Sequence, residues 1–326
     1  MQKSKNVRII GSGIHLPNMV RTSNELEDVL NLEHGWTEKR TGIKTRRVSG
    51  DCSLIDLYVN ASVEAVRNAS RRSVDHITIC QDYSGREVGR VFGSVCDAMS
   101  NIGVETKNAS FAMGFPHCAG YVSGLKNSFY ELKNTKKENA LVVGASKLFD
   151  CFNPVSPETS VLWGDGAGAL VLSSQDAQEG LGLLYFKEIT SPEQYFEFTH
   201  SEDGHPYVKM DGKGVYKFVI RNVPNLIRAG LSEASEEIGE DIGLDKISLF
   251  LFHQANKRMI QAVQEELGLP QDRFLINVDT LGNTGVASIP IAYHQARCDG
   301  RVRPGEYYVI CGFGVGMQAN MALIKA

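Results

Sequence analysis

Residues 109–125, ASFAMGFPHCAGYVSGL, run from a short apolar stretch into a turn-like Phe-Pro-His and then into small residues. The first part is typical of a buried strand. In residues 118–133 apolar side chains recur at helical spacing, which predicts a helix with Cys118 at its N-terminus. Unpaired N–H groups and the positive end of the helix dipole favour a thiolate there, so we expect a lowered pKa for Cys118.

The same alternation of strand and helix continues along the chain and predicts an α/β fold. Strands alternating with helices imply crossover connections and a largely parallel sheet. The strands are predicted at 7–14, 76–82, 109–115, 140–146, 168–174, 247–254, 306–314 and 318–326. The helices are predicted at 53–69, about 90–101, 118–133, 213–237, 256–267 and 285–297.

Length and composition narrow the class of protein. The chain has 326 residues, suits two packed halves (1–175 and 176–326), and its most loop-like stretch lies between residues 172 and 190. A net charge of −4 gives no reason to expect a nucleic-acid or membrane partner. Seven cysteines without a CxxC pair indicate reduced thiols and no metal site. Without a signal peptide or an apolar run of about 20 residues, we expect a cytoplasmic protein.

Four segments after predicted strands carry reactive or glycine-rich residues: Cys118, His253, Asn283 and the turn GFGVGM at 312–317. A glycine-rich turn can direct backbone N–H groups at an oxyanion, and His and Asn side chains can donate to a second developing charge. Each signal alone is weak, because a buried cysteine is often inert and an Asn in a GNTG turn often serves only the turn. Together they indicate Cys-His-Asn nucleophilic catalysis, which also describes papain-like hydrolases.

The sequence resembles the β-ketoacyl-acyl-carrier-protein synthase III family of the thiolase superfamily along essentially the whole chain. The resemblance implies a thiolase-like five-layered αβαβα fold with two similar halves, and a homodimer. The motifs that carry it are GWTEKRTGI (35–43), Cys118 with AGYVSGL, WGDGAGALVL (163–172), VKMDGKGVYKF (208–218), HQANKRMI (253–260), VDTLGNTGVASIP (278–290) and the terminal GFGVGM.

The resemblance also assigns roles to individual positions. Three of these roles have a simpler alternative: ordinary packing for Trp36, and solvated surface charges for Lys217 and Arg258. The implied roles are nucleophile for Cys118; enolate donors for His253 and Asn283; backbone oxyanion hole for Cys118 and Val315; coenzyme A binding for Trp36, Arg40 and Asn256; and carrier-protein docking for Lys217 and Arg258.

The implied reaction is a decarboxylating condensation. An acyl group from acyl-CoA is transferred to Cys118 and then joined to a malonyl thioester carried by acyl carrier protein, and the resemblance implies no metal or redox cofactor. Two alternatives remain: acyl transfer without condensation, and a non-catalytic subunit that supports an active paralogue.

The sequence departs from the family pattern just before the nucleophile. Met113 stands where the family usually has Asp, and Phe115-Pro116-His117 replaces a run of small residues. This change leaves the triad intact and puts the substrate in doubt, although a repacked end of the sheet is the simpler interpretation. Phe92 and Phe115 add bulk near the expected acyl pocket, which a dimer partner would close near Val91 and Phe92, so we expect a short to medium acyl primer.

Overall fold

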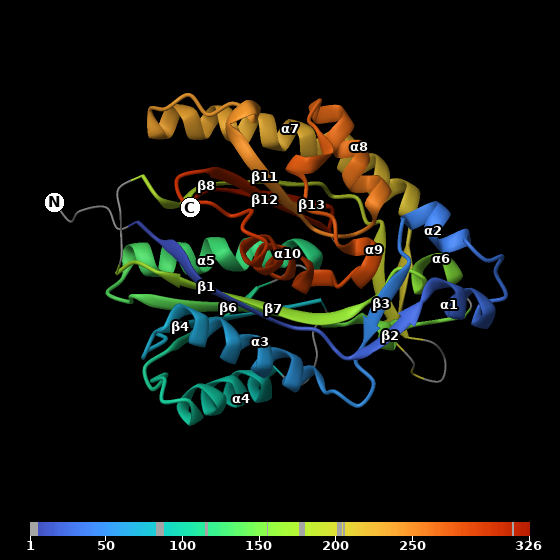
Figure 1. Cartoon of the computed structure of the whole chain (residues 1–326), viewed down its shortest axis with the longest axis horizontal. Helices are drawn as coiled ribbons and strands as arrows, with labels where there is room; N and C mark the ends of the chain where they lie inside the picture. The colour runs from blue at the N-terminus through green and yellow to red at the C-terminus, as the bar shows by residue number, and fades with distance from the viewer. Residues whose placement is uncertain are drawn as a thin grey trace.

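The computed structural model arranges helices and sheets in five layers (Figure 1). α3 (Leu54–Ala69) and α4 (Val88–Asn101) form the lowest layer in that view, and a sheet lies above them. α5 (Gly120–Asn134) and α10 (Ser288–Cys298) run between this sheet and a second one, which a last layer of helices covers. The arrangement agrees with the predicted five-layered architecture. The structure describes residues 6–82, 88–114, 117–154, 156–175, 180–200, 204, 206–314 and 316–326.

The three inner strands of the first sheet, β4, β6 and β7, are buried on both faces and are therefore largely apolar. Small residues let the helices lie close to it. A Cβ added to Gly124 of α5 would lie 2.6 Å from Sγ of Cys80, so a larger residue there would push the helix away from β4. The strand order is β1 (Arg8–His15), β7 (Asp165–Ser173), β6 (Asn139–Lys147), β4 (His76–Gln81) and β5 (Ser110–Gly114).

The second sheet repeats this pattern with the later part of the chain. α7 (Gly212–Ile238) and α8 (Lys257–Leu267) pack on its outer face through a cluster of buried apolar side chains. The strand order is β11 (Ile247–Phe252), β12 (Tyr307–Gly314), β13 (Gln318–Lys325) and β8 (Gly182–Thr190). The proposed division after residue 175 falls between β7 and β8 and stays a prediction.

The prediction of a largely parallel sheet is wrong, because both sheets are mixed. β4 pairs in parallel with β5 and β6, and β11 with β12, but the other four pairs are antiparallel. Only residues 315–317 separate β12 from β13, which is too short for a crossover connection. β8 was also missed, because it begins inside the stretch that appeared most loop-like.

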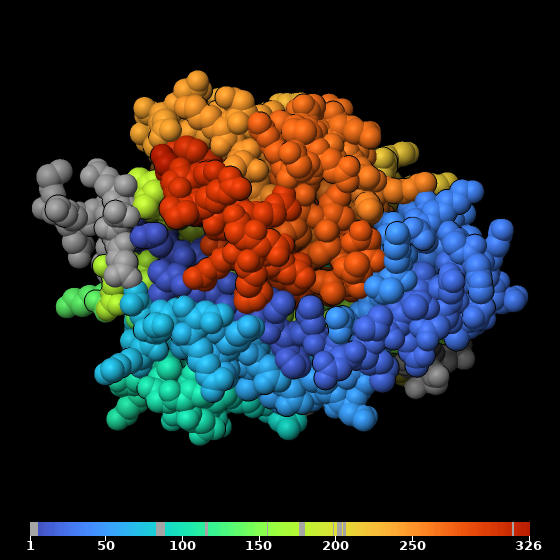
Figure 2. Space-filling view, in the orientation of Figure 1, coloured from blue at the N-terminus to red at the C-terminus, as the bar shows by residue number. Residues whose placement is uncertain are grey.

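Short elements at one end of the molecule frame the approach to the site. Figure 2 shows this end in blue, next to the orange surface of the later chain. Arg46 is fully buried there, and its Nη2 donates to the carbonyl of Val161 at 2.8 Å, which ties this end to the segment before Trp163. The elements are β2 (Met19–Thr22), α1 (Ser23–Val29), α2 (Trp36–Thr41), β3 (Thr45–Val48), α6 (Pro157–Ser160), the hairpin of β9 (Phe196–His200) and β10 (Pro206–Met210), and α9 (Val278–Leu281).

Among the residues with described positions, no helix combines the length and the apolar character that crossing a bilayer would require.

Candidate active site

Cys118 lies at the entry to α5, as predicted. It occupies a single 3₁₀ turn, His117–Ala119, directly before the helix, and is 7% exposed. The end of β12 passes close by, since a Cβ added to Gly314 would lie 3.0 Å from Cβ of Cys118. His117 has a φ of +38°, a left-handed conformation that non-glycine residues rarely adopt. The nucleophile position is therefore built on a sharp, closely packed turn.

His253 follows β11, and its ring is held from behind. The residue is 2% exposed, its backbone N–H donates to the carbonyl of Cys311 at 2.8 Å, and its Nδ1 lies 2.7 Å from Oγ of Ser288. Burial lowers the pKa of His253 to about 3, against a smaller opposing effect of the Gly285 backbone. At neutral pH the imidazole is therefore uncharged.

Asn283 is fixed by backbone on both sides and by its own side chain. Its N–H donates to the carbonyl of Leu162 at 2.7 Å, and its carbonyl accepts from the N–H of Gly164 at 3.0 Å. Its side-chain Oδ1 accepts from the N–H of Gly285 at 2.9 Å. Because the amide oxygen is occupied, Nδ2 is the group left to donate to a ligand.

The three predicted catalytic residues meet in one pocket of about 50 Å³. Cys118 and His253 follow strands as the sequence indicated, whereas Asn283 follows the short helix α9; their catalytic roles stay predictions. Sequence reasoning missed most of the wall around them, because Phe196 belongs to a hairpin that no pattern predicted. The remaining lining is mostly apolar: Trp163, Phe196, Met210, Val215, Ala255, Phe313, Gly314 and Met317.

The expectation of a lowered thiol pKa for Cys118 is wrong. Burial raises the pKa of this thiol well above its ordinary value, and the Asp82 carboxylate raises it further, while a backbone hydrogen bond acts in the opposite direction. Desolvation disfavours the charged thiolate, and at this site it outweighs the helix N-terminus. The thiol is therefore protonated at neutral pH.

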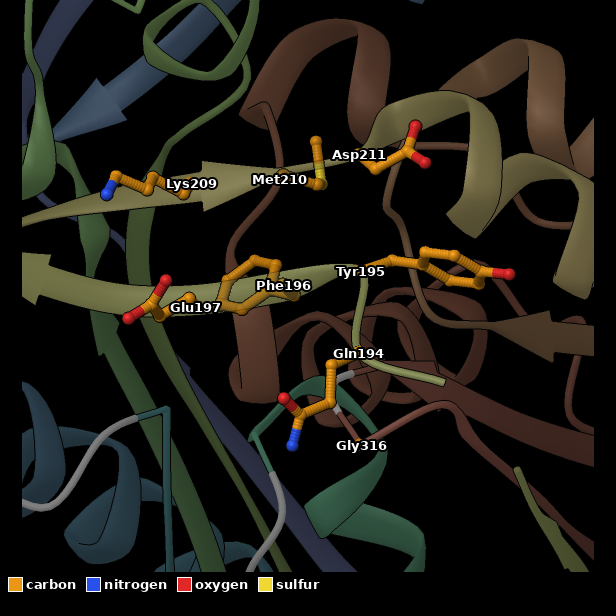
Figure 3. Close-up of a pocket in the computed structure, with 8 residues that line it drawn as sticks. All are labelled: Gln194, Tyr195, Phe196, Glu197, Lys209, Met210, Asp211 and Gly316. Carbon is orange, nitrogen blue, oxygen red and sulfur yellow. The ribbon is translucent and has the colours of Figure 1, made fainter. Parts of the chain in front are cut away.

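A second cavity, of about 580 Å³, adjoins the pocket (Figure 3). Phe196 and Met210 line both spaces, and in Figure 3 they lie on neighbouring strands, β9 and β10. Glu197 and Lys209 add charges at this cavity, so it is more polar than the pocket. The hairpin thus forms a wall between an apolar site and a polar opening.

The predicted coenzyme A residues are only partly brought together. Arg40 lies over the ring of Trp36, with Cζ 4.3 Å from the ring centroid, and both line a cavity of about 550 Å³ together with Arg258. Asn256 caps α8 by accepting from the N–H of Met259 at 3.0 Å, and its neighbour Ala255 lines the catalytic pocket. Lys217 is exposed on α7, away from these linings.

Three predicted positions lie outside the described residues: Val315, Phe115 and Pro116. Phe92 packs on Phe111 with ring centroids 4.8 Å apart, and it is not part of the described lining around Cys118.

Comparison with known proteins agrees with this geometry. Residues 116–191 match the family 3-oxoacyl-[acyl-carrier-protein (ACP)] synthase III, and residues 240–326 match its C-terminal part. The β-ketoacyl-[acyl-carrier-protein] synthase III of Aquifex aeolicus is 30% identical over 98% of this chain and 99% of its own length. The chain belongs to the β-ketoacyl-acyl-carrier-protein synthase III family. It is therefore an acyltransferase-type condensing enzyme with a thiolase-like fold.

Other relatives and solved structures give the same result. The corresponding synthase III of Clostridium perfringens (strain SM101) is 30% identical over 98% of this chain and 99% of its own length. The crystal structure of the Aquifex aeolicus synthase superposes with a TM-score of 0.86 at 28% identity, covering 98% of this chain and 100% of that one. The priming β-ketosynthase of the R1128 polyketide pathway superposes with a TM-score of 0.87 over 100% of this chain and 98% of its own, but at 24% identity it supports the fold alone.

The raised thiol pKa predicts how Cys118 reacts with iodoacetamide. Only the thiolate reacts, so modification should be slow at pH 7 and reach half its maximal rate above about pH 9. Mass spectrometry of the peptide over pH 6 to 11 would measure this, with the exposed Cys298 as internal control for the reagent. A half-maximal rate below pH 8 would show that burial does not dominate at this thiol.

Proposed function

We propose that this family member transfers an acyl group from acyl-CoA to Cys118 and then condenses it with a malonyl thioester, most simply malonyl-acyl carrier protein. The observation that supports this most is the meeting of a thiol, a neutral imidazole and an amide in one small apolar pocket. The product would be a 3-oxoacyl thioester.

In the first half-reaction the Cys118 sulfur attacks the thioester carbonyl, and the coenzyme A thiol leaves with the proton. Backbone N–H groups near Cys118 and in the glycine-rich turn after Gly314 would hold the oxyanion, with Val315 as the second donor. Because the thiol is protonated at rest, a base must accept its proton. The neutral ring of His253 can do so at Nε2 in the tautomer whose own proton is on Nδ1 and is donated to Oγ of Ser288, whereas the other tautomer serves the second half-reaction.

In the second half-reaction the malonyl C–C bond breaks, CO₂ leaves, and the electron pair moves to the thioester oxygen as an enolate. If the Ser288 hydroxyl donates to Nδ1 of His253, the ring proton is on Nε2 and can be donated to this oxygen. Nδ2 of Asn283 is the second donor. The enolate carbon then attacks the acyl-Cys118 carbonyl and releases the thiolate. No metal or redox cofactor is needed in this scheme.

We further propose a cytoplasmic homodimer that uses acyl-CoA and acyl carrier protein. Arg258 and Lys217 are exposed cations on neighbouring helices, which suits an acidic carrier protein. The position of His117 in place of a small residue is compatible with a specialised pathway as well as with fatty-acid synthesis. Acyl transfer without condensation is the alternative, and it gives no role to the free amide of Asn283.

The two half-reactions can be separated by substitution. Cys118→Ala should abolish acyl-enzyme formation yet still release CO₂ from a malonyl thioester, because decarboxylation needs no nucleophile. Asn283→Ala should accept acyl groups but decarboxylate about 10²- to 10³-fold more slowly, as for the loss of an oxyanion donor. Labelled CO₂ release and intact-protein mass would measure both, with Cys298→Ala as control. If Asn283→Ala condenses at the wild-type rate, or loses acylation like Cys118→Ala, this division of roles is wrong.

The pocket predicts a short to medium acyl primer. The pocket around Cys118 is small, at about 50 Å³, and its aromatic wall limits expansion. Intact-protein mass spectrometry with a C2 to C16 acyl-CoA series should show labelling of Cys118 mainly by the shorter chains. Preferential labelling by C14 or C16 would contradict this.

The cavity lined by Trp36 and Arg40 predicts that Arg40→Ala weakens the binding of acyl-CoA. If Arg40 and Trp36 hold the adenine, the substitution should raise KM for acyl-CoA by roughly 5- to 30-fold, or about 1–2 kcal/mol. Acylation by an N-acetylcysteamine thioester, which lacks the nucleotide, should barely change. Lys44→Ala removes an exposed cation outside the cavity lining and is the matched control. If the substitution impairs acylation equally with acyl-CoA and with the N-acetylcysteamine thioester, Arg40 has a structural role and does not bind the nucleotide.

A further inference from the structure

Asp82 is a buried carboxyl group that the reaction scheme leaves without a role. It follows β4 directly and is 4% exposed. Its Oδ1 accepts from the N–H of Val286 at 2.8 Å, and its Oδ2 accepts from Oγ of Ser146 on β6. Burying a carboxyl group costs free energy unless hydrogen bonds compensate for the lost water, so we expect these hydrogen bonds to stabilise the fold or the site.

The partner of Asp82 is the turn that carries the catalytic amide. Gly285 has a φ of +50°, and a Cβ added to it would lie 2.4 Å from both carboxyl oxygens of Asp82. No other residue than glycine fits between this turn and the carboxyl group. The N–H of the same Gly285 holds Oδ1 of Asn283.

The same turn also holds the catalytic imidazole. Ser288, two residues after Val286, contacts Nδ1 of His253 at 2.7 Å. Both proposed enolate donors are therefore fixed by residues 283–288, and Asp82 anchors this segment from the first sheet. A shift of the turn would move Asn283 and His253 together.

The charge of Asp82 reaches the nucleophile as well. Burial raises the pKa of Asp82 to about 7, opposed by the Ser146 and Val286 hydrogen bonds, so the carboxyl group titrates near neutrality. Its ionised form raises the pKa of Cys118. The other titratable groups on which its charge acts are Tyr58 from α3, Cys80 from β4 and Cys151 from the turn after β6.

We propose that Asp82 is a positioning residue that anchors the 283–288 turn for decarboxylation and opposes formation of the Cys118 thiolate through its charge. The inference rests on the proposed function for its first part, while the second part concerns the thiol alone. Asp82 would thus act on both half-reactions: the group that orders the enolate donors also adds to the effect of burial on the Cys118 thiol.

Two substitutions separate these parts. Asp82→Asn keeps an oxygen for the N–H of Val286 and removes the charge, so decarboxylation of labelled malonyl-CoA should stay within about 3-fold of wild type. The iodoacetamide profile of Cys118 should shift to lower pH by about 1 unit, because the opposing charge is gone. Asp82→Ala should show the same shift and also lose about 10-fold in CO₂ release, because a buried N–H is left unpaired.

Asp165→Asn is the matched control. Asp165 is also a buried carboxyl group, but it accepts from the N–H groups of Ser49 and Phe149 and not from the 283–288 turn. Asp165→Asn should leave the pH profile of Cys118 modification by iodoacetamide unchanged.

An unchanged Cys118 profile in Asp82→Asn, or wild-type CO₂ release by folded Asp82→Ala, would overturn the proposal. If Asp82→Ala does not fold, the Asp82→Asn profile still decides the charge effect. Failure of the proposed function would look different, because the wild-type protein itself would then neither acylate nor release CO₂.

Discussion

Two backbone hydrogen bonds between Asn283 and the segment around Trp163 join the two halves of the molecule where the chemistry is built. The N–H of Asn283 donates to Leu162, and Gly164 donates back to the carbonyl of Asn283. The contact leaves no room for a side chain, since a Cβ added to Gly164 would lie 2.0 Å from the carbonyl oxygen of Leu281. The position of the Asn283 amide therefore depends on the packing of one half against the other as well as on its own loop, where the N–H of Gly285 holds Oδ1.

This dependence explains why the site is so deeply buried. Cys118 comes from the first half of the chain, whereas His253 and Asn283 come from the second, so they can meet only in the interface between the sheets. All three residues are buried there, and burial sets the charge states: a neutral imidazole at pH 7 and a protonated thiol. The fold thus supplies the electrostatics as well as the geometry.

Much of this could be predicted from the sequence, and the reasons for the failures are physical. Buried strands such as β6 and β12 are continuous apolar runs, and Cys118 and His253 could be found from their positions after β5 and β11, whereas Asn283 follows the short helix α9. β8 was missed because it begins inside the loop-like stretch, and the β9–β10 hairpin carries charged residues and lacks such a run, so the wall that includes Phe196 was missed as well. The thiol pKa of Cys118 was predicted in the wrong direction, because a helix N-terminus is visible in a sequence and desolvation is not. Asp82 gave no signal, since its partner turn lies about two hundred residues further along the chain.

The apolar wall has a chemical consequence for the proposed condensation. A malonyl carboxylate in the pocket would lose the water that stabilises its charge, whereas the CO₂ that leaves is neutral and the new charge appears on the thioester oxygen. Phe196, Phe313 and Met317 line the pocket with side chains that cannot donate a hydrogen bond to the carboxylate. His253 and Asn283 are the proposed donors to the enolate oxygen, and both are uncharged. They can therefore stabilise the negative charge on that oxygen as it forms, but they do not bind the starting carboxylate as a cation would. The same desolvation that raises the thiol pKa thus favours the step that drives the condensation.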